Sequence, residues 1–140
     1  MKISVHAASA SEVESVRRLY CDVGYPGGVA DSDRVVVATV AGLVVGAFRL
    51  THEEGVFVLR GMRVTPARQL QGIGTRLLHG LQGVEEPCFL IAHAHLQRFY
   101  GRAGFVALAD EASPGFLGAR AAEYRSRGLD AVVMRRKPAS

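Results

Sequence analysis

The chain has 140 residues, of which 49% are hydrophobic and 21% are charged, and its formal net charge is +4. This length predicts one domain over residues 1–140 that can bury a core, and the composition is ordinary for a globular protein. No apolar run approaches the ~20 residues that a membrane helix needs. The N-terminus lacks the apolar core of a signal peptide, so we expect a cytoplasmic protein without a membrane partner.

Periodicity in the first half predicts a strand, a helix and a three-stranded meander. Ser11 to Glu14 fit a capping box, and the apolar residues that follow at helical spacing lead to a helix end near Gly24. The expected strands cover residues 2–8, 34–40, 43–51 and 56–65, with turns at 41–42 and 52–55. Gly61 interrupts the last of these strands, either as a bulge or for close packing.

The second half alternates short helices with strands. The continuously apolar stretch 88–92 predicts a strand that is covered on both faces. Helices are expected over 74–82 and 96–103, and a further helix over 116–127 that ends at Gly128. The remaining strands are expected over 105–108 and 131–135.

The two cysteines and the basic residues bear on whether the protein binds a metal or nucleic acid. Cys21 and Cys88 lie in apolar patterns and are predicted to be buried thiols, without the spacing of a metal site. We therefore expect no metal.

The basic residues are scattered, apart from a run over 135–137, so nucleic acid is not the expected partner. Nearly all of them are Arg, which is typical of a GC-rich bacterial genome.

The stretch 63–78 predicts a strand end, a tight turn and a helix start. Pro66 cannot donate to a sheet ladder, and Gly72 and Gly74 permit backbone angles that side chains forbid. Unpaired amides before a helix favour an anion such as phosphate. A Walker loop would need a Lys, and a Rossmann fingerprint would need a third Gly where Leu77 stands. The alternative is a loop that is merely softened by glycines.

Two motifs carry a family resemblance. Gln69, Gly72 and Gly74 fill the pattern Gln/Arg-x-x-Gly-x-Gly/Ala, which resembles the pyrophosphate loop of the GNAT N-acetyltransferase superfamily. The segment Phe99–Phe105 is similar to the Phe-Tyr-x-x-x-Gly-Phe motif of the same superfamily. The two motifs stand in the family's order, and the resemblance covers residues 2–108 and the final strand.

The resemblance implies a fold and a co-substrate. The fold class is α/β (α+β), with a mixed, mostly antiparallel seven-stranded sheet that is flanked by helices and splayed between strands 4 and 5. The co-substrate is acetyl-coenzyme A, and no metal is implied. The implied binding residues are Met62, Arg63, Val64, Gln69, Leu70, Gln71, Gly72, Ile73, Gly74, Thr75, His93 and Tyr100.

The resemblance also implies direct attack of an amine on the acetyl carbonyl. By position Tyr100 would protonate the leaving thiolate, whereas Phe99 is expected in the core. His93 stands where family members often carry Asn, and it could bond the ligand, deprotonate the amine or simply satisfy the strand end. Glu54 is a candidate base, as are the neighbouring Glu53 and His52, although carboxylates at a turn are usually just solvated.

Two regions depart from the family pattern. Residues 24–33 are too short and too Gly-rich for the usual second helix, and the stretch between the last two strands is longer than usual. Both normally border the acceptor site, so the acceptor stays open between a small-molecule amine and a peptide amine. The alternatives are a non-catalytic acyl-coenzyme A-binding or regulatory module and, on charge alone, a nucleic-acid-binding domain. A homodimer is left open.

Overall fold

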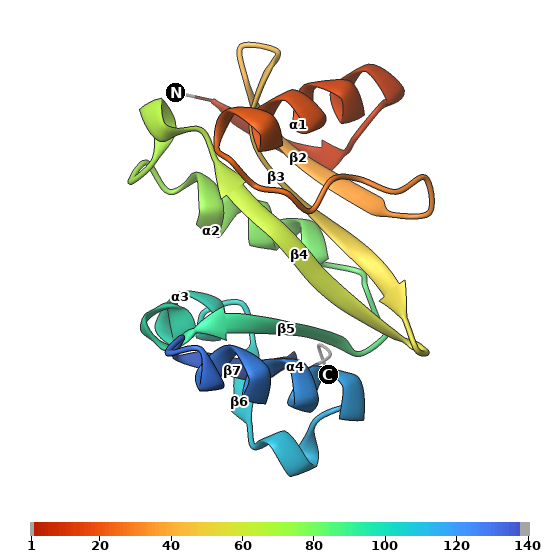
Figure 1. Cartoon of the computed structure of the whole chain (residues 1–140). Helices are drawn as coiled ribbons and strands as arrows, with labels where there is room; N and C mark the ends of the chain where they lie inside the picture. The colour runs from red at the N-terminus through yellow and green to blue at the C-terminus, as the bar shows by residue number, and fades with distance from the viewer. Residues whose placement is uncertain (1, 138–140) are drawn as a thin grey trace. The chain divides into compact units, whose positions relative to one another are not determined.

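The computed structural model describes residues 2–137, which contain seven strands, four α-helices and four short 3-10 helices (Figure 1). The strands are β1 (Ile3–Ala7), β2 (Arg34–Val40), β3 (Leu43–Glu53), β4 (Val56–Val64), β5 (Cys88–His93), β6 (Phe105–Leu108) and β7 (Ala131–Arg136). The helices are α1 (Ala10–Asp22), α2 (Ile73–Leu78), α3 (Gln97–Gly101), α4 (Gly115–Ser126), η1 (Pro66–Arg68), η2 (His79–Leu81), η3 (Ala94–Leu96) and η4 (Asp110–Ala112). Within this range, no helix has the length and apolar character needed to cross a membrane.

The seven strands form one mixed sheet in the order β1-β2-β3-β4-β5-β7-β6. β4 pairs with β5 in parallel, through Phe57 with Cys88 and Val58 with Phe89. The pairs β1–β2, β2–β3, β5–β7 and β6–β7 are antiparallel. A parallel pair needs a crossover connection, which α2 supplies between β4 and β5. The predicted mixed seven-stranded sheet with flanking helices is confirmed.

The described residues form two compact units. The first contains the chain up to Gly55 together with Leu59–Val84, and the second contains Val56–Val58 together with the chain from Glu85 onward. The boundary falls within β4, so the parallel ladder to β5 belongs to the second unit. A single domain over residues 1–140 stays a prediction.

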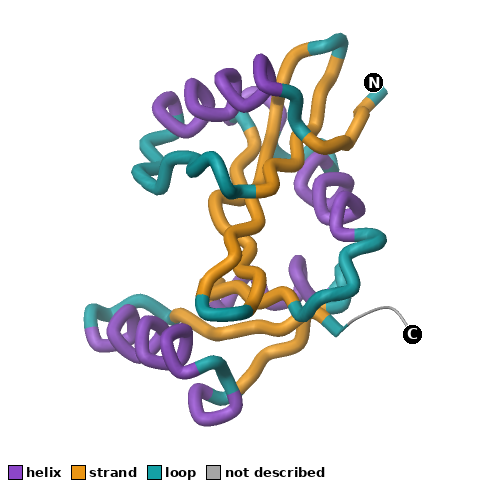
Figure 2. The backbone as a smooth tube through the Cα atoms, turned by 90° about the vertical axis from the view of Figure 1, so that its right-hand side faces the viewer, coloured by secondary structure: helices purple, strands orange, loops and turns teal. Residues whose placement is uncertain are grey.

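In the first unit, α1 and α2 lie on either side of the strands (Figure 2). Val35 and Val37 of β2 join the buried cluster of α1, which includes Val16. The intervening Val36 lies on the other face, where a Cβ on Gly80 would come within 2.6 Å of its Cγ1. Successive strand residues point to opposite faces, so β2 needs apolar residues throughout.

The N-cap of α1 is Ser9. Its Oγ accepts a hydrogen bond from the Glu12 backbone N–H at 3.3 Å, and Glu12 Oε1 accepts one from the Ser9 N–H at 3.0 Å. The predicted capping box at Ser11 and Glu14 was wrong, because both serines stand three residues before a glutamate. Glu12 is also held by the His6 Nε2 at 2.9 Å, which favours the earlier box.

The hairpin turn between β3 and β4 is shorter than the predicted turn over 52–55. β3 continues to Glu53, and the turn consists of Glu54 and Gly55, with φ of 47° and 84°. Positive φ at both central residues gives a tight turn whose twist matches that of the flanking strands. His52 and Glu53 therefore belong to β3.

Both predicted departures from the family pattern are confirmed. The segment 23–33 between α1 and β2 contains turns and no helix. The connection between β6 and β7 holds η4 and α4, and α4 lies within one residue of the predicted helix over 116–127.

The core of the second unit lies between α4 and the sheet. Leu117 and Ala121 of α4 are fully buried and pack with Phe89, Val133 and Val58. The opposite face of β5 is buried as well, as the exposed fraction of only 2% at Leu90 shows. The prediction that this strand is covered on both faces is confirmed.

The two cysteines differ in exposure. Cys88 is buried in β5, as predicted, whereas Cys21 is exposed. The prediction for Cys21 was wrong because the buried face of α1 carries Val16, Leu19 and Tyr20, and a residue directly after Tyr20 is turned about 100° away from it.

We predict that Ser9→Ala lowers the free energy of unfolding by about 1 kcal/mol, because it removes the acceptor for the Glu12 N–H. Ser11→Ala is the matched control and should change it by less than about 0.5 kcal/mol. Urea denaturation of both variants measures the difference. Equal losses would contradict the assignment of Ser9 as the N-cap.

Candidate active site

β4 leaves the extended conformation at Gly61, where φ is 66°. The Tyr20 hydroxyl donates a hydrogen bond to the Gly61 carbonyl oxygen at 2.9 Å. A Cβ on Gly61 would lie 2.4 Å from the Tyr20 Oη, closer than any real contact. The glycine is therefore required both for its backbone angle and for the close approach of the tyrosine.

The loop after β4 turns sharply before α2. The Gln69 side chain donates from Nε2 to the Val64 carbonyl oxygen at 3.2 Å, which ties the loop to the strand end. Leu70 is fully exposed and has a φ of 64°, and Gly72 has a φ of 79°. No atom lies within 4 Å of the position that a Cβ on Gly72 would take, so the space beside this backbone is open.

α2 begins directly after Gly72, which is its N-cap. The Arg76 N–H donates to the Gly72 carbonyl oxygen at 3.1 Å. The N–H groups of Ile73, Gly74 and Thr75 belong to the first turn and have no acceptor within the helix. Together with the helix dipole, they make the open space at Gly72 favourable for an anion.

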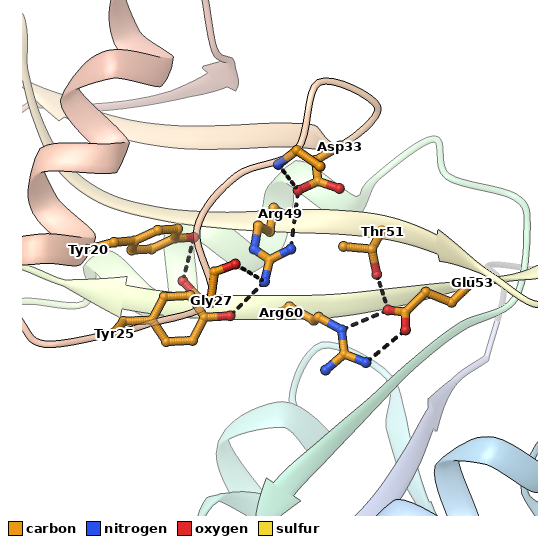
Figure 3. A network of polar contacts seen from close by, with 10 residues as sticks. Tyr20, Tyr25, Gly27, Asp33, Arg49, Thr51, Glu53 and Arg60 are labelled. Atoms are coloured by element: carbon orange, nitrogen blue, oxygen red, sulfur yellow. Dashed lines mark hydrogen bonds and ion pairs between the residues drawn. The ribbon is translucent and has the colours of Figure 1, made fainter.

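A buried arginine ties the segment 23–33 to β3 (Figure 3). Arg49 donates from Nη1 to Asp33 Oδ2 at 3.1 Å and from Nη2 to the Tyr25 hydroxyl at 2.8 Å. The side chains of Arg49 and Asp33 are only 9% and 4% exposed. The Ala30 N–H donates to the same Asp33 oxygen at 2.9 Å. These bonds order the segment in place of a helix.

The Tyr25 ring connects this network to β4. The Arg63 Cζ lies 4.7 Å and the Arg49 Cζ 5.8 Å from its centroid, which is the range of cation–π contacts. The Tyr20 ring meets it edge-on at 4.6 Å. Burial raises the pKa of Tyr20, so its hydroxyl stays a proton donor. Burial acts to lower the pKa of Arg49, but the hydrogen bonds with Tyr25 and Asp33 raise it overall.

The candidate bases at the β3–β4 hairpin differ in their surroundings. The Glu53 carboxylate accepts bonds from Arg60 Nε at 2.7 Å and Nη2 at 3.0 Å, and a further bond from the Thr51 hydroxyl. Glu54 is exposed at the tip of the turn, and His52 is exposed on β3. Glu53 thus serves to hold the two strands together.

In the second unit, His93 ends β5 and lies beside Asp130. The His93 Nδ1 is 3.0 Å from Asp130 Oδ1, and the His95 ring stacks on the His93 ring at 5.7 Å. The side chains of His93 and Asp130 are 53% and 60% exposed. Residues 2–137 contain no group of three or more His, Cys, Asp and Glu side chains that could hold a metal ion.

Tyr100 lies in α3 and is 7% exposed. Its ring meets the Phe99 ring edge-on at 4.9 Å and the Phe105 ring at 5.9 Å. Phe99 is only half-buried, so the expectation that Phe99 rather than Tyr100 fills the core was wrong. In a helix of five residues, the sequence does not decide which of two adjacent aromatics faces inward.

The predicted site residues are divided between the two units. The strand end Met62–Val64 and the loop Gln69–Thr75 lie in the first, and His93 and Tyr100 lie in the second. The sequence reasoning missed Asp130. In the structure His93 pairs with Ala131, and this register places Asp130 beside His93.

The arginine network was also missed. Arg49 is the charged residue in a strand that is otherwise apolar over 43–50, which already indicated a buried partner.

Residues 31–107 match the family model of the acetyltransferase (GNAT) domain, which is more than half of the chain. The chain belongs to the GNAT acetyltransferase family. This confirms the family that the two motifs predict. A comparison with curated proteins gave no significant match.

Solved structures share the fold of this GNAT protein at low sequence identity. An acyl-CoA N-acyltransferase from Pseudomonas aeruginosa is 23% identical, with a TM-score of 0.70, and the match covers 97% of this chain and 100% of that one. N-acetylglutamate synthase from Neisseria gonorrhoeae, complexed with coenzyme A and N-acetyl-glutamate, is 17% identical, with a TM-score of 0.67 and coverage of 100% and 36%. The PaiA N-acetyltransferase from Thermoplasma acidophilum, in complex with coenzyme A, is 15% identical, with a TM-score of 0.63 and coverage of 98% and 99%.

We predict that Arg49→Met lowers the free energy of unfolding by about 3–5 kcal/mol, because it leaves the buried Asp33 carboxylate without its charged partner. Arg127→Met is the control, because the Arg127–Glu123 pair is exposed. Breaking that pair should cost about 0–1 kcal/mol. Denaturant titration gives both values, and a loss under 1 kcal/mol for Arg49→Met would contradict the role of the network.

Proposed function

We propose that this GNAT protein is an N-acetyltransferase that moves an acetyl group from acetyl-coenzyme A to an amine of a small molecule or peptide. The family and the fold support acyl transfer from an acyl-coenzyme A in general. The observation that carries the proposal is the connection from β4 to α2, where Gly72 combines a left-handed backbone with open space before a helix N-terminus.

The residues present fit coenzyme A. Gln69–Thr75 would wrap the pyrophosphate with first-turn N–H groups, and the backbone of Met62–Val64 would pair with the amides of the pantetheine arm. Both roles come from the family resemblance, which also implies His93 and Tyr100 as binding residues. The coenzyme A complexes of two structural neighbours support the same ligand.

The proposed reaction is direct attack of the neutral amine on the thioester carbonyl. The C–N bond forms, the C–S bond breaks, and the departing thiolate takes up a proton. Tyr100 would donate that proton as general acid. Glu54 and His93 are the bases that the sequence offers for the amine proton.

A second candidate is a non-catalytic acyl-coenzyme A-binding or regulatory module on the same fold. The burial of Tyr100 between two phenylalanine rings favours this reading, because a packed aromatic needs no catalytic role. Release of free thiol from acetyl-coenzyme A in the presence of pooled primary amines separates the two. Amine-dependent release supports the enzyme, whereas binding without any release supports the module.

We predict that Gly72→Val weakens acetyl-coenzyme A binding at least 10-fold, because a side chain at this φ distorts the loop and fills the space offered to phosphate. Gly42→Val is a matched control, since Gly42 has a φ of 78° and equally open surroundings in the β2–β3 turn. Calorimetry measures both affinities. Similar affinities for the two variants would show that this loop is not the phosphate site.

We predict that Tyr100→Phe lowers kcat by about 10²–10⁴-fold, the range for loss of a general acid, with KM nearly constant. The ring and its packing stay, so coenzyme A affinity should change little. Steady-state thiol release with the best amine of the pool provides the measurement. A change within a few-fold would demote Tyr100 to a core aromatic without disproving acetyl transfer.

A further inference from the structure

The histidine at the end of β5 has one ring nitrogen engaged and one available. Its Nδ1 lies 3.0 Å from Asp130 Oδ1, and among residues 2–137 no hydrogen bond engages its Nε2. More than half of the His93 side chain is exposed, so solvent and small molecules reach the ring.

A second histidine–carboxylate pair is arranged differently. His6 bonds Glu12 through Nε2 at 2.9 Å, and its Nδ1 lies 3.2 Å from the Ser4 hydroxyl. Both of its ring nitrogens are therefore occupied, and Glu12 is itself part of the helix cap. Of these two pairs, the one at His93 combines an anchored Nδ1 with an available Nε2.

The partner decides which nitrogen of His93 carries the proton. The hydrogen bond from His93 lowers the pKa of Asp130, so its carboxylate is ionised near neutral pH and can only accept. Nδ1 must then donate, and a neutral imidazole keeps its lone pair on Nε2. The Ala94 N–H donates to the Asp130 carbonyl oxygen at 3.0 Å. This bond fixes the main chain of Asp130 beside the His93 ring.

His93 and Tyr100 lie on opposite faces of the sheet in the second unit. Phe89 and Ile91 pack against the α4 cluster, and His93 follows them at the spacing of one strand face. Leu108 of β6 packs on that same cluster. Phe105 precedes it by three residues, so its side chain lies on the other face of the sheet. Tyr100 contacts Phe105 there. Direct transfer needs two separate groups, a base at the amine and an acid at the thiolate.

We propose that His93 is the general base, that its Nε2 takes the proton of the acceptor amine, and that Asp130 is a positioning residue that holds it in the Nδ1–H tautomer. This rests on the proposed N-acetyltransferase function. As the C–N bond forms and the C–S bond breaks, one proton passes from the amine to Nε2 and another from Tyr100 to the thiolate. Water then restores both residues.

The tautomer is measured first and needs no acceptor. In ¹⁵N-labelled full-length protein at pH ~8, the imidazole shifts of His93 should report a protonated Nδ1 and an unprotonated Nε2. Asp130→Asn should reverse this, because an amide can donate to Nδ1. An Nε2–H tautomer in the parent protein would overturn the proposal.

The rate is measured second, as thiol release from acetyl-coenzyme A with pooled primary amines. His93→Gln should lower kcat by about 10²-fold or more. Asp130→Asn should cause a loss of the same order, because it selects the wrong tautomer, with KM for acetyl-coenzyme A nearly unchanged. Glu123→Gln is the matched control, since it removes a similarly exposed carboxylate, 57% against 60%, from a pair with Arg127.

The outcomes test the role of His93 separately from the acetyltransferase function. Large losses in both variants, with Glu123→Gln at the parental rate, support the dyad. A parental rate in His93→Gln overturns the assignment of His93 as the general base and leaves the acetyltransferase function intact. A parent protein without any amine-dependent release overturns the proposed function and the base together.

Discussion

The contact between the Tyr20 hydroxyl and the Gly61 carbonyl oxygen connects three parts of the first unit. It runs from α1 to β4 at 2.9 Å, and it is possible only because residue 61 has no Cβ. The Tyr25 ring packs against Tyr20 and receives Arg49, so the segment 23–33 is fixed by the same cluster. The remainder of β4 then leads directly into the loop that precedes α2.

The proposed chemistry of the protein depends on where two strands end. β4 leads into a loop whose last residue, Gly72, is the N-cap of α2. The backbone N–H groups that lack helical acceptors therefore lie directly after Gly72. β5 ends at His93, and the antiparallel partner β7 places Asp130 beside it. A strand end is a natural position for such groups, because the ladder stops there and side chains and amides become available.

Much of the fold could be predicted because hydrophobic periodicity is a local property. The bounds of β2 and β6 agree with the sequence pattern, and α4 differs from it by one residue. The N-cap of α1 could not be predicted, because Ser9 and Ser11 satisfy the same local rule and the choice depends on contacts of Glu12.

In the candidate site, the turn and helix start around Gly72 could be predicted because the motif covers contiguous residues. Contacts between residues that are distant in sequence could not be predicted. Asp130 is separated from His93 by α3, β6 and α4, and Asp33 is separated from Arg49 by a hairpin. The inward orientation of Tyr100 depends on Phe105, which only the folded β6 brings to it.

The most direct test of this account is titration of ¹⁵N-labelled protein with acetyl-coenzyme A, followed through the backbone amide signals. The account predicts saturable shifts that are largest at Gly72, Ile73, Gly74 and Thr75, because these N–H groups would gain phosphate oxygens as acceptors. Amide signals of the β2–β3 turn around Gly42 should stay in place. Unchanged signals at millimolar ligand, or shifts that leave the loop unaffected, would contradict it.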